Sequence, residues 1–152
     1  MSWLSPLGIL SLAVLLASAF VDVRNQRVPV EWAVAWASLA LILRGQADGF
    51  GDFDRGVLSG LVAGLASAAF FGALAWKKRL DASDASLMGA LGVAMGFPQV
   101  FAAWVFISLA GAAEAVIFSV ATRSLKGRRV PYTLAIAAGV LCTFAWDVSS
   151  AR

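Results

Sequence analysis

Apolar stretches as long as a membrane-spanning helix alternate with short polar segments along the chain. A helix needs about 20 apolar residues to cross about 30 Å of hydrocarbon. Met1–Val21 and Gly56–Trp76 have that length, and Val130–Trp146 is nearly as long. Val30–Leu43 is a shorter apolar stretch that follows Pro29. No Lys or Arg precedes the first stretch, so we interpret it as a retained span and not as a signal peptide.

The third apolar stretch contains a regular stripe of small residues. Every fourth position is glycine or alanine: Gly56, Gly60, Gly64, Ala68 and Gly72. Residues four apart lie on one face of a helix, and small residues there let a neighbouring backbone approach closely. We therefore expect this face to be a helix–helix contact.

One apolar stretch, Ala85–Thr122, is too long for a single crossing. Its about 38 residues would extend about 57 Å as one helix. Gly96-Phe97-Pro98, near its middle, is typical of a turn. A hairpin turning at these residues would put the basic clusters before and after the stretch on the same side of a membrane. The chain is then expected to cross the membrane six times.

Basic residues gather in short segments between the apolar stretches. In the six-span arrangement nine of the twelve Lys and Arg residues lie on one side, which the positive-inside rule identifies as cytoplasmic. These nine are Arg24, Arg27, Lys77, Lys78, Arg79, Arg123, Lys126, Arg128 and Arg129. Both termini and the loop Arg44–Arg55, which carries Asp48, Asp52 and Asp54, are expected on the opposite side.

Composition excludes an ordinary soluble domain. Of the 152 residues, 61% are apolar and 14% are charged, against about 45–50% and about 25% in soluble domains. A soluble chain of this size buries only about 70% of its surface, so one core cannot hide the excess. We expect an all-α polytopic membrane protein with six transmembrane helices, in which residues 1–152 form a single transmembrane domain.

The absence of histidine and the single cysteine, Cys142, narrow the chemistry further. They exclude a Ser-His-Asp triad, a His-based metal site, an intramolecular disulfide and a CxxC metal knuckle. The net charge is +3, and the positive charges lie in short clusters that are typical of segments setting the orientation of a membrane protein. We therefore expect the lipid bilayer, and no nucleic acid, as a partner. No metal and no cofactor are expected.

Acidic residues at the span ends are functional candidates, because ionisable groups at membrane depth are costly. Asp22 ends the first span and Asp84 begins the fourth, both on the expected cytoplasmic side. Two carboxyls that meet can act as an aspartyl protease pair, in which one draws a proton from water and the other hydrogen-bonds the scissile carbonyl. On pattern alone, Asp22 fits an ordinary solvated helix end, and Asp84 fits the N-cap of the next helix in a mixed-charge loop. Glu114, inside the fifth span, is a packed acid, a proton partner or a substrate contact.

Three segments carry the most specific patterns in the chain. Asp22-Val23-Arg24-Asn25-Gln26-Arg27-Val28-Pro29 is an Asp followed by basic residues and Val-Pro. Asp81-Ala82-Ser83-Asp84-Ala85-Ser86-Leu87 precedes a helix of small residues, and Val130-Pro131-Tyr132-Thr133 opens the last span. In order, spacing and layout these segments resemble the type IV prepilin leader peptidases of the short TadV/CpaA type. Their second signature is Gly-x-Gly-Asp, a small apolar residue, Lys and Leu, and they are similar in function to other intramembrane aspartyl proteases with Gly-x-Gly-Asp.

The resemblance implies that Asp22 and Asp84 are the catalytic pair of an aspartic-type endopeptidase. The implied substrate is a prepilin or pseudopilin of a type IV pilus or Tad secretion system, cut between its short basic leader and its hydrophobic helix. The implied location is the bacterial cytoplasmic (inner) membrane, with both acids facing the cytoplasm. Longer members carry a cysteine-containing domain and N-methylate the new terminus. With one cysteine in this chain, we expect no N-methyltransferase activity.

The second signature departs from the family pattern. Asp81 and Ser83 stand in place of its two glycines, and Ser86 stands in place of Lys. Glycine would permit close approach or positive φ beside the catalytic acid, and Asp81 adds a third carboxylate. The alternative is therefore a family member that binds pilins or assembly proteins without cutting them. A small transporter that uses the membrane acids as a proton path is a third hypothesis, but no pair of interrupted helices occupies corresponding halves of the sequence.

Overall fold

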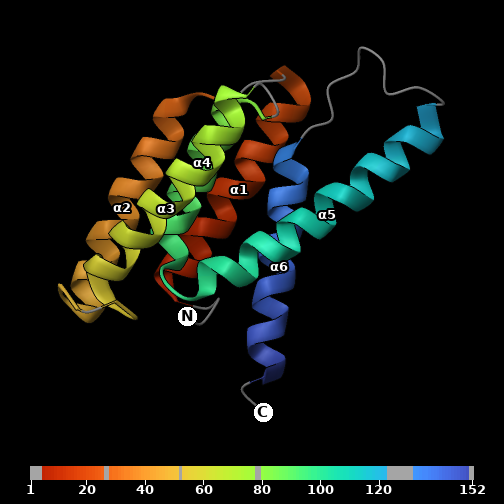
Figure 1. Ribbon diagram of the computed structural model, residues 1–152. Helices are drawn as coiled ribbons and strands as arrows, with labels where there is room; N and C mark the ends of the chain where they lie inside the picture. The colour runs from red at the N-terminus through yellow and green to blue at the C-terminus, as the bar shows by residue number, and fades with distance from the viewer. Residues whose placement is uncertain (1–4, 26–27, 52, 78–79, 123–131, 151–152) are drawn as a thin grey trace.

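The computed structural model forms six α-helices and no β-strand in the residues that it describes (Figure 1). These residues are 5–25, 28–51, 53–77, 80–122 and 132–150. The helices are α1 Pro6–Asn25, α2 Val30–Asp48, α3 Gly56–Trp76, α4 Ala82–Met95, α5 Gln99–Thr122 and α6 Tyr132–Ser150. The all-α prediction is confirmed for this part of the chain.

Two helices, α3 and α5, are long and apolar enough to cross a membrane. Only 33% of the apolar window of α3 and 17% of that of α5 are buried, so most of each window faces outward. Large apolar side chains such as Leu65, Leu109 and Ile117 are exposed along them. Apolar surface of this extent is typical of contact with lipid or with another protein. Shorter apolar segments lie in α1, α4 and α6, and the six crossings stay a prediction.

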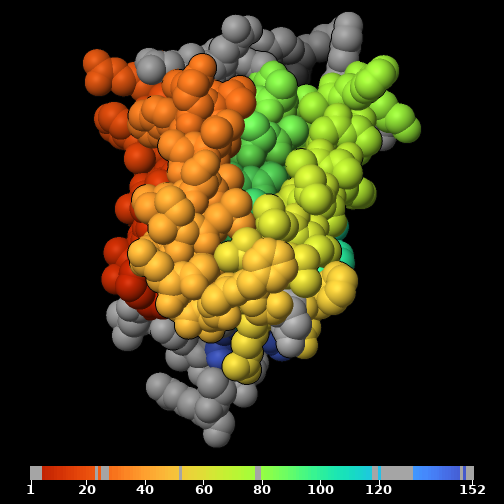
Figure 2. All heavy atoms as spheres, turned by 90° about the vertical axis from the view of Figure 1, so that its left-hand side faces the viewer, coloured from red at the N-terminus to blue at the C-terminus, as the bar shows by residue number. Residues whose placement is uncertain are grey.

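The central helix of the bundle is α4. Ten of its fourteen residues are buried, and it contacts each of the other five helices. Figure 2 shows it between α2 and α3. Its side chains Leu87, Met88 and Leu91 are fully buried in the core. Because α4 is enclosed in this way, contacts with neighbouring helices fix the position of both its ends.

Small residues let α3 and α4 pack closely, as the stripe predicted. A Cβ atom added at Gly64 of α3 would overlap the side chain of Val93 on α4. From the other side, a Cβ at Gly92 would lie 2.6 Å from the carbonyl oxygen of Ala63. At Gly72, no described residue outside its own stretch of helix comes within 4 Å of such a Cβ. The contact therefore uses the middle of the stripe and not its end.

Gly92→Ala is expected to lower the free energy of unfolding by about 1–3 kcal/mol, the usual effect of overpacking. The added methyl group would meet the backbone of Ala63, which moves only if α3 shifts. Thermal unfolding in detergent micelles measures the change. Gly72→Ala is the matched control, since its site is open and alanine favours a helix. Equal Tm values for the two variants would contradict the close contact.

The predicted break between the fourth and fifth spans is confirmed. α4 ends at Met95, and Gly96 follows it with a φ of 72°. α5 begins at Gln99, directly after the cis Phe97-Pro98 bond. Ser59 of α3 holds this turn: its hydroxyl accepts the Phe97 N–H at 2.8 Å and donates to the Phe97 carbonyl at 3.2 Å. From the turn, α5 crosses α6 and diverges from the other helices (Figure 1).

The predicted loop Arg44–Arg55 is wrong in its first part, because α2 continues to Asp48. The predicted span ended before Arg44 because that residue is charged, yet its side chain is only 6% exposed. It fits inside the bundle because it hydrogen-bonds backbone carbonyls. The first and last helices also extend beyond their predicted ends, to Asn25 and Ser150. Residues 1–4, 52, 130 and 131, which belong to predicted spans or loops, lie outside the described residues.

Five helix ends meet at the upper end of the bundle in Figure 1, where α1 and α3 end and α2, α4 and α6 begin. Arg24, in the last turn of α1, and Lys77, at the end of α3, lie here. The other seven predicted cytoplasmic basic residues lie outside the described residues. α1 begins and α6 ends at the lower end (Figure 1).

Candidate active site

Asp22 and Asp84 both lie at the upper end of the bundle, on different helices. Asp22 is three residues before the end of α1, and Asp84 is in the first turn of α4. Helix α1 contacts α4, and both contact α6. The two acids therefore belong to the same end of three helices that pack against one another.

The Asp22 carboxylate is held by a hydroxyl from α6. Thr133 Oγ1 donates a hydrogen bond to Asp22 Oδ2 at 2.5 Å. Thr133 is only 1% exposed, and Asp22 is half-buried. A freely hydrated helix end does not account for this contact, because the carboxylate lies between two helices and has a buried partner.

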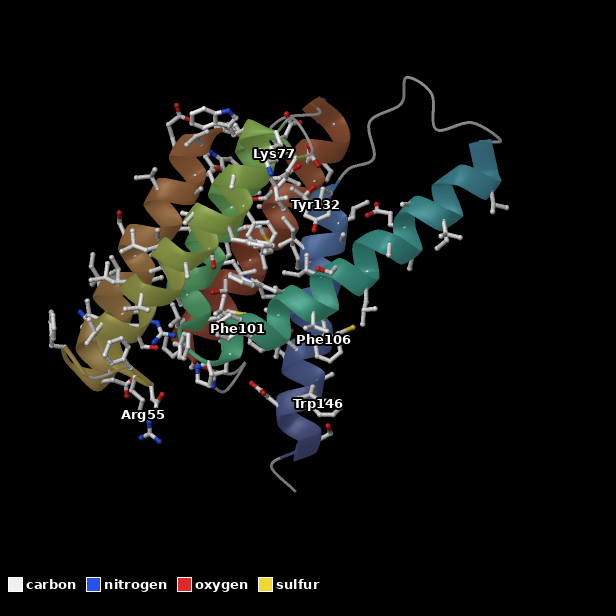
Figure 3. All side chains as sticks on the ribbon, in the orientation of Figure 1. Arg55, Lys77, Phe101, Phe106, Tyr132 and Trp146 are labelled. Carbon is white, nitrogen blue, oxygen red and sulfur yellow. The ribbon has the colours of Figure 1, made fainter. Side chains whose placement is uncertain are left out.

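Asp84 is buried, with 8% of its surface exposed. It interacts electrostatically with Tyr132, the first residue of α6, and Figure 3 shows Tyr132 near the upper end of that helix, beside α5. The N-cap residue of α4 is Asp81 and not Asp84, so capping does not explain why Asp84 is buried. Its place in the first turn favours a negative charge, because the free N–H groups of the helix lie there.

The first turn of α6 connects the two acids. Thr133 binds Asp22, and its neighbour Tyr132 interacts with Asp84. Both acids therefore lie near the start of α6, and Asp22 is in direct contact with it. The N-terminus of α6 adds a partial positive charge. Two carboxyls, two hydroxyls and a helix N-terminus thus share one region.

The unusual second signature fits the observed backbone without glycine. Asp81, at the first glycine position, has a φ of −76° and a ψ of 150°, an extended conformation open to any residue. Ser83, at the second position, lies within α4, and its carbonyl accepts the Ser86 hydroxyl at 2.7 Å. Neither position has a positive φ. The replacements therefore leave Asp84 in a regular first helical turn.

Sequence reasoning assigned no role to Tyr132 or Thr133 and left that of Glu114 open. The first two belong to the Pro-Tyr segment, so the pattern indicated the segment but not the action of its hydroxyls. Glu114 of α5 interacts electrostatically with Asp22. One turn earlier, a Cβ at Gly111 would lie 3.0 Å from the Tyr132 ring. α5 therefore packs closely against the first turn of α6 at Gly111.

A cavity of about 530 Å³ lies at the opposite end of the bundle. The start of α1, the end of α2 and the loop after it line this cavity, with Arg44, Asp48 and Arg55 among the lining residues. Neither candidate catalytic acid lines it. In the part of the chain that the structure describes, no group of three His, Cys, Asp or Glu side chains is placed to hold a metal ion.

Comparison of the chain with protein-family models, with curated proteins and with solved structures gives no match.

Proposed function

We propose that the protein is a membrane aspartyl endopeptidase that removes the short basic leader of a prepilin or pseudopilin. The observation that supports this most directly is that Asp22 of α1 and the buried Asp84 of α4 lie at the same end of helices that pack against one another and against α6. The resemblance of three segments to the leader peptidase signatures adds the substrate class. Leader removal from a prepilin co-expressed with the parental chain, and its loss when either acid is replaced, tests the proposal.

The chemistry of the proposed site uses two carboxyls and one water molecule. In such a pair an ionised carboxylate takes a proton from the water, while the protonated partner hydrogen-bonds the carbonyl oxygen of the scissile bond. The attacking hydroxide adds to the carbonyl carbon, and the C–N bond then breaks as the nitrogen takes up a proton. We assign the Thr133 hydroxyl to orienting Asp22, since it donates a hydrogen bond to Oδ2.

The proposed orientation places the acids on the cytoplasmic side of the bacterial inner membrane, in a chain with six crossings. Its support is the pair of apolar helices α3 and α5 and the basic residues Arg24 and Lys77 at the end that carries the acids. A basic leader would remain on that side, since positive segments cross poorly. The scissile bond would then lie where the acids are.

Cysteine labelling tests this orientation. In a Cys142→Ser background, Phe53→Cys lies in the exposed loop after α2, and Lys77→Cys lies at the opposite end of α3. We expect a membrane-impermeant maleimide added to spheroplasts to label position 53, and to label position 77 only after the membrane is permeabilised. The reverse pattern would contradict the proposed sidedness, and labelling of both positions in sealed cells would contradict a span between them.

The altered second signature favours a second candidate function, that of a pilin-binding or assembly factor that does not cut. Asp81 places an extra carboxyl group three residues before Asp84, and nearby like charges disfavour ionisation of both members of a pair. This candidate predicts that assembly survives replacement of either catalytic acid. Cleaved pilin produced by the purified protein excludes it.

A further inference from the structure

The cavity of about 530 Å³ at the lower end of the bundle has the size of a small-molecule site, which is usually about 300–1,000 Å³. The start of α1, the end of α2, the loop between α2 and α3 and the start of α5 line it. Its lining residues Asp48, Asp54 and Arg55 are exposed, so the cavity opens to the surface at this end. A ligand can therefore enter it without disturbing the core.

The inner wall of the cavity favours an anionic group. Arg44 is buried and lines the cavity, and the three carbonyl groups that bind its guanidinium group are neutral and do not balance its charge. Two helices also begin at the cavity, α1 at Pro6 and α5 at Gln99 (Figure 1). Each helix N-terminus carries about half a positive charge. Together these groups attract an anion such as a phosphate.

The rim of the cavity carries charges of both signs. Asp48 is the last residue of α2, and Arg55 is the last residue before α3. Figure 3 shows the Arg55 side chain extending outward from the loop at the lower end. Asp48 attracts an ammonium group, and Arg55 attracts the anionic part of the same ligand. The wall and the rim together fit a ligand in which an anionic group and a primary ammonium group lie close to each other.

Apolar surface beside the cavity shows where the rest of such a ligand lies. Leu7 and Leu43 are part of the lining, and Ile9 of α1 and Ile42 of α2 are more than half exposed. Because α1 begins and α2 ends at the cavity, both isoleucines lie on the side of the cavity toward the middle of the bundle. Exposed apolar side chains at this depth fit acyl chains better than water.

We propose that the cavity binds the phosphoethanolamine headgroup of a phosphatidylethanolamine molecule, whose acyl chains lie along α1 and α2. The phosphate lies toward Arg44 and the two helix N-termini, and the ammonium group lies at Asp48. In the proposed orientation this end faces away from the cytoplasm, so the lipid belongs to the outer leaflet of the bilayer. The inference goes beyond the peptidase proposal, since it uses neither catalytic acid and depends only on the membrane location of the chain.

Native mass spectrometry of the full chain released from detergent micelles measures lipid binding, as phosphatidylethanolamine is titrated into the micelles. Phosphatidylglycerol with the same acyl chains lacks the ammonium group, and phosphatidylcholine has three methyl groups in place of its N–H donors. We expect dissociation constants about fivefold higher or more for both, the effect of one lost charge-assisted hydrogen bond at a partly exposed site. Equal dissociation constants for the three lipids would overturn the headgroup site.

Two exposed side chains at the rim test the contacts without disturbing the core. Arg55→Gln should raise the dissociation constants of phosphatidylethanolamine and phosphatidylglycerol about fivefold, because both lipids have the phosphate. Asp48→Asn should raise only that of phosphatidylethanolamine. Arg24→Gln and Glu31→Gln are the matched controls, exposed residues at the opposite end of the bundle, and should change neither constant. Binding that is unchanged in both rim variants rules out the site, and an equal effect of Asp48→Asn on the two lipids contradicts the ammonium contact.

O-Phosphoethanolamine, which is the headgroup without acyl chains, distinguishes a lipid from a soluble ligand. It should not displace the lipid at about a hundredfold excess, because it makes no apolar contact with α1 and α2. If it does displace the lipid, the headgroup site stands and the assignment to a lipid is overturned. None of these measurements uses cleavage, so their outcome is separate from success or failure of the peptidase proposal.

Discussion

Asp22→Asn and Asp84→Asn are each expected to reduce leader removal by about a thousandfold or more. Loss of a group that takes or gives a proton in the reaction costs about 10²–10⁴ in rate, and members of one catalytic unit do not replace each other. Asparagine keeps the size of the side chain, and at position 22 its carbonyl oxygen can still accept the Thr133 hydrogen bond. The expected loss is therefore one of chemistry and not of folding.

The mobility shift of a co-expressed prepilin measures leader removal, and purified protein with the same substrate in detergent confirms it. Asp48→Asn removes an exposed acid at the opposite end of the bundle and should process at the parental rate. Parental rates in both the Asp22 and the Asp84 variant would show that the catalytic pair is wrong. An equal loss in the Asp48 variant would show that the effect passes through the fold.

Hydrophobic length predicted most of the helices because apolar runs and turn residues are local features. The bounds of α3 agree with the prediction, and the break at Gly96-Phe97-Pro98 is where the chain turns. At Arg44 the same reasoning predicted the wrong end for the second helix. A charged residue marks the end of an apolar stretch, and none of its neighbours in the sequence shows that carbonyl groups about 50 residues later will bind its side chain. At Gly72 it predicted a helix–helix contact that does not form, because the stripe of small residues continues beyond the place where α3 packs against α4.

The candidate site was accessible from the sequence only in part. Spacing and resemblance identified Asp22 and Asp84, but not the Thr133 hydroxyl that binds Asp22. The pairing of Thr133 with Asp22 joins residues 111 positions apart, and it depends on the rotation of α1 and α6 about their axes. Among the described residues, the buried oxygens Ser18 Oγ and Glu114 Oε2 have no hydrogen-bond partner, and this too is a property of packing. A sequence shows which groups are polar, but not which of them lack a partner.

Arg44→Met is expected to lower the free energy of unfolding by about 3 kcal/mol or more, since a buried acceptor that loses its donor costs about 1–3 kcal/mol. The guanidinium group donates to three carbonyl oxygens: Val93 at 2.9 Å, Ala94 at 3.0 Å and Gly56 at 3.2 Å. Methionine fills similar space and donates to none of them. A Cβ at Gly60 would lie 3.0 Å from Arg44 Cδ, so the neighbouring helix leaves room for this side chain in particular.

The length of α4 explains why its end needs an arginine. Its fourteen residues extend about 21 Å, less than the about 30 Å of hydrocarbon. If α4 enters from the cytoplasmic side, as proposed, its last turn lies within the membrane, where water does not reach the free carbonyls. The Gly92 carbonyl accepts the Gly96 N–H at 2.8 Å, and Arg44 satisfies Val93 and Ala94. The side chain thus takes the place of solvent.

Thermal or denaturant unfolding in micelles shows whether Arg44 stabilises the protein by binding the last carbonyl groups of α4 or only through its charge. Arg55→Met removes an exposed arginine at the same end and should change stability by less than about 0.5 kcal/mol. Arg44→Lys keeps the charge but cannot reach three carbonyls with one ammonium group, so it should fall between the parental chain and Arg44→Met. If Arg44→Met is as stable as Arg55→Met, the arginine does not hold the end of α4. Because Asp84 lies in the first turn of the same helix, leader removal should fall in the same order as stability across these variants.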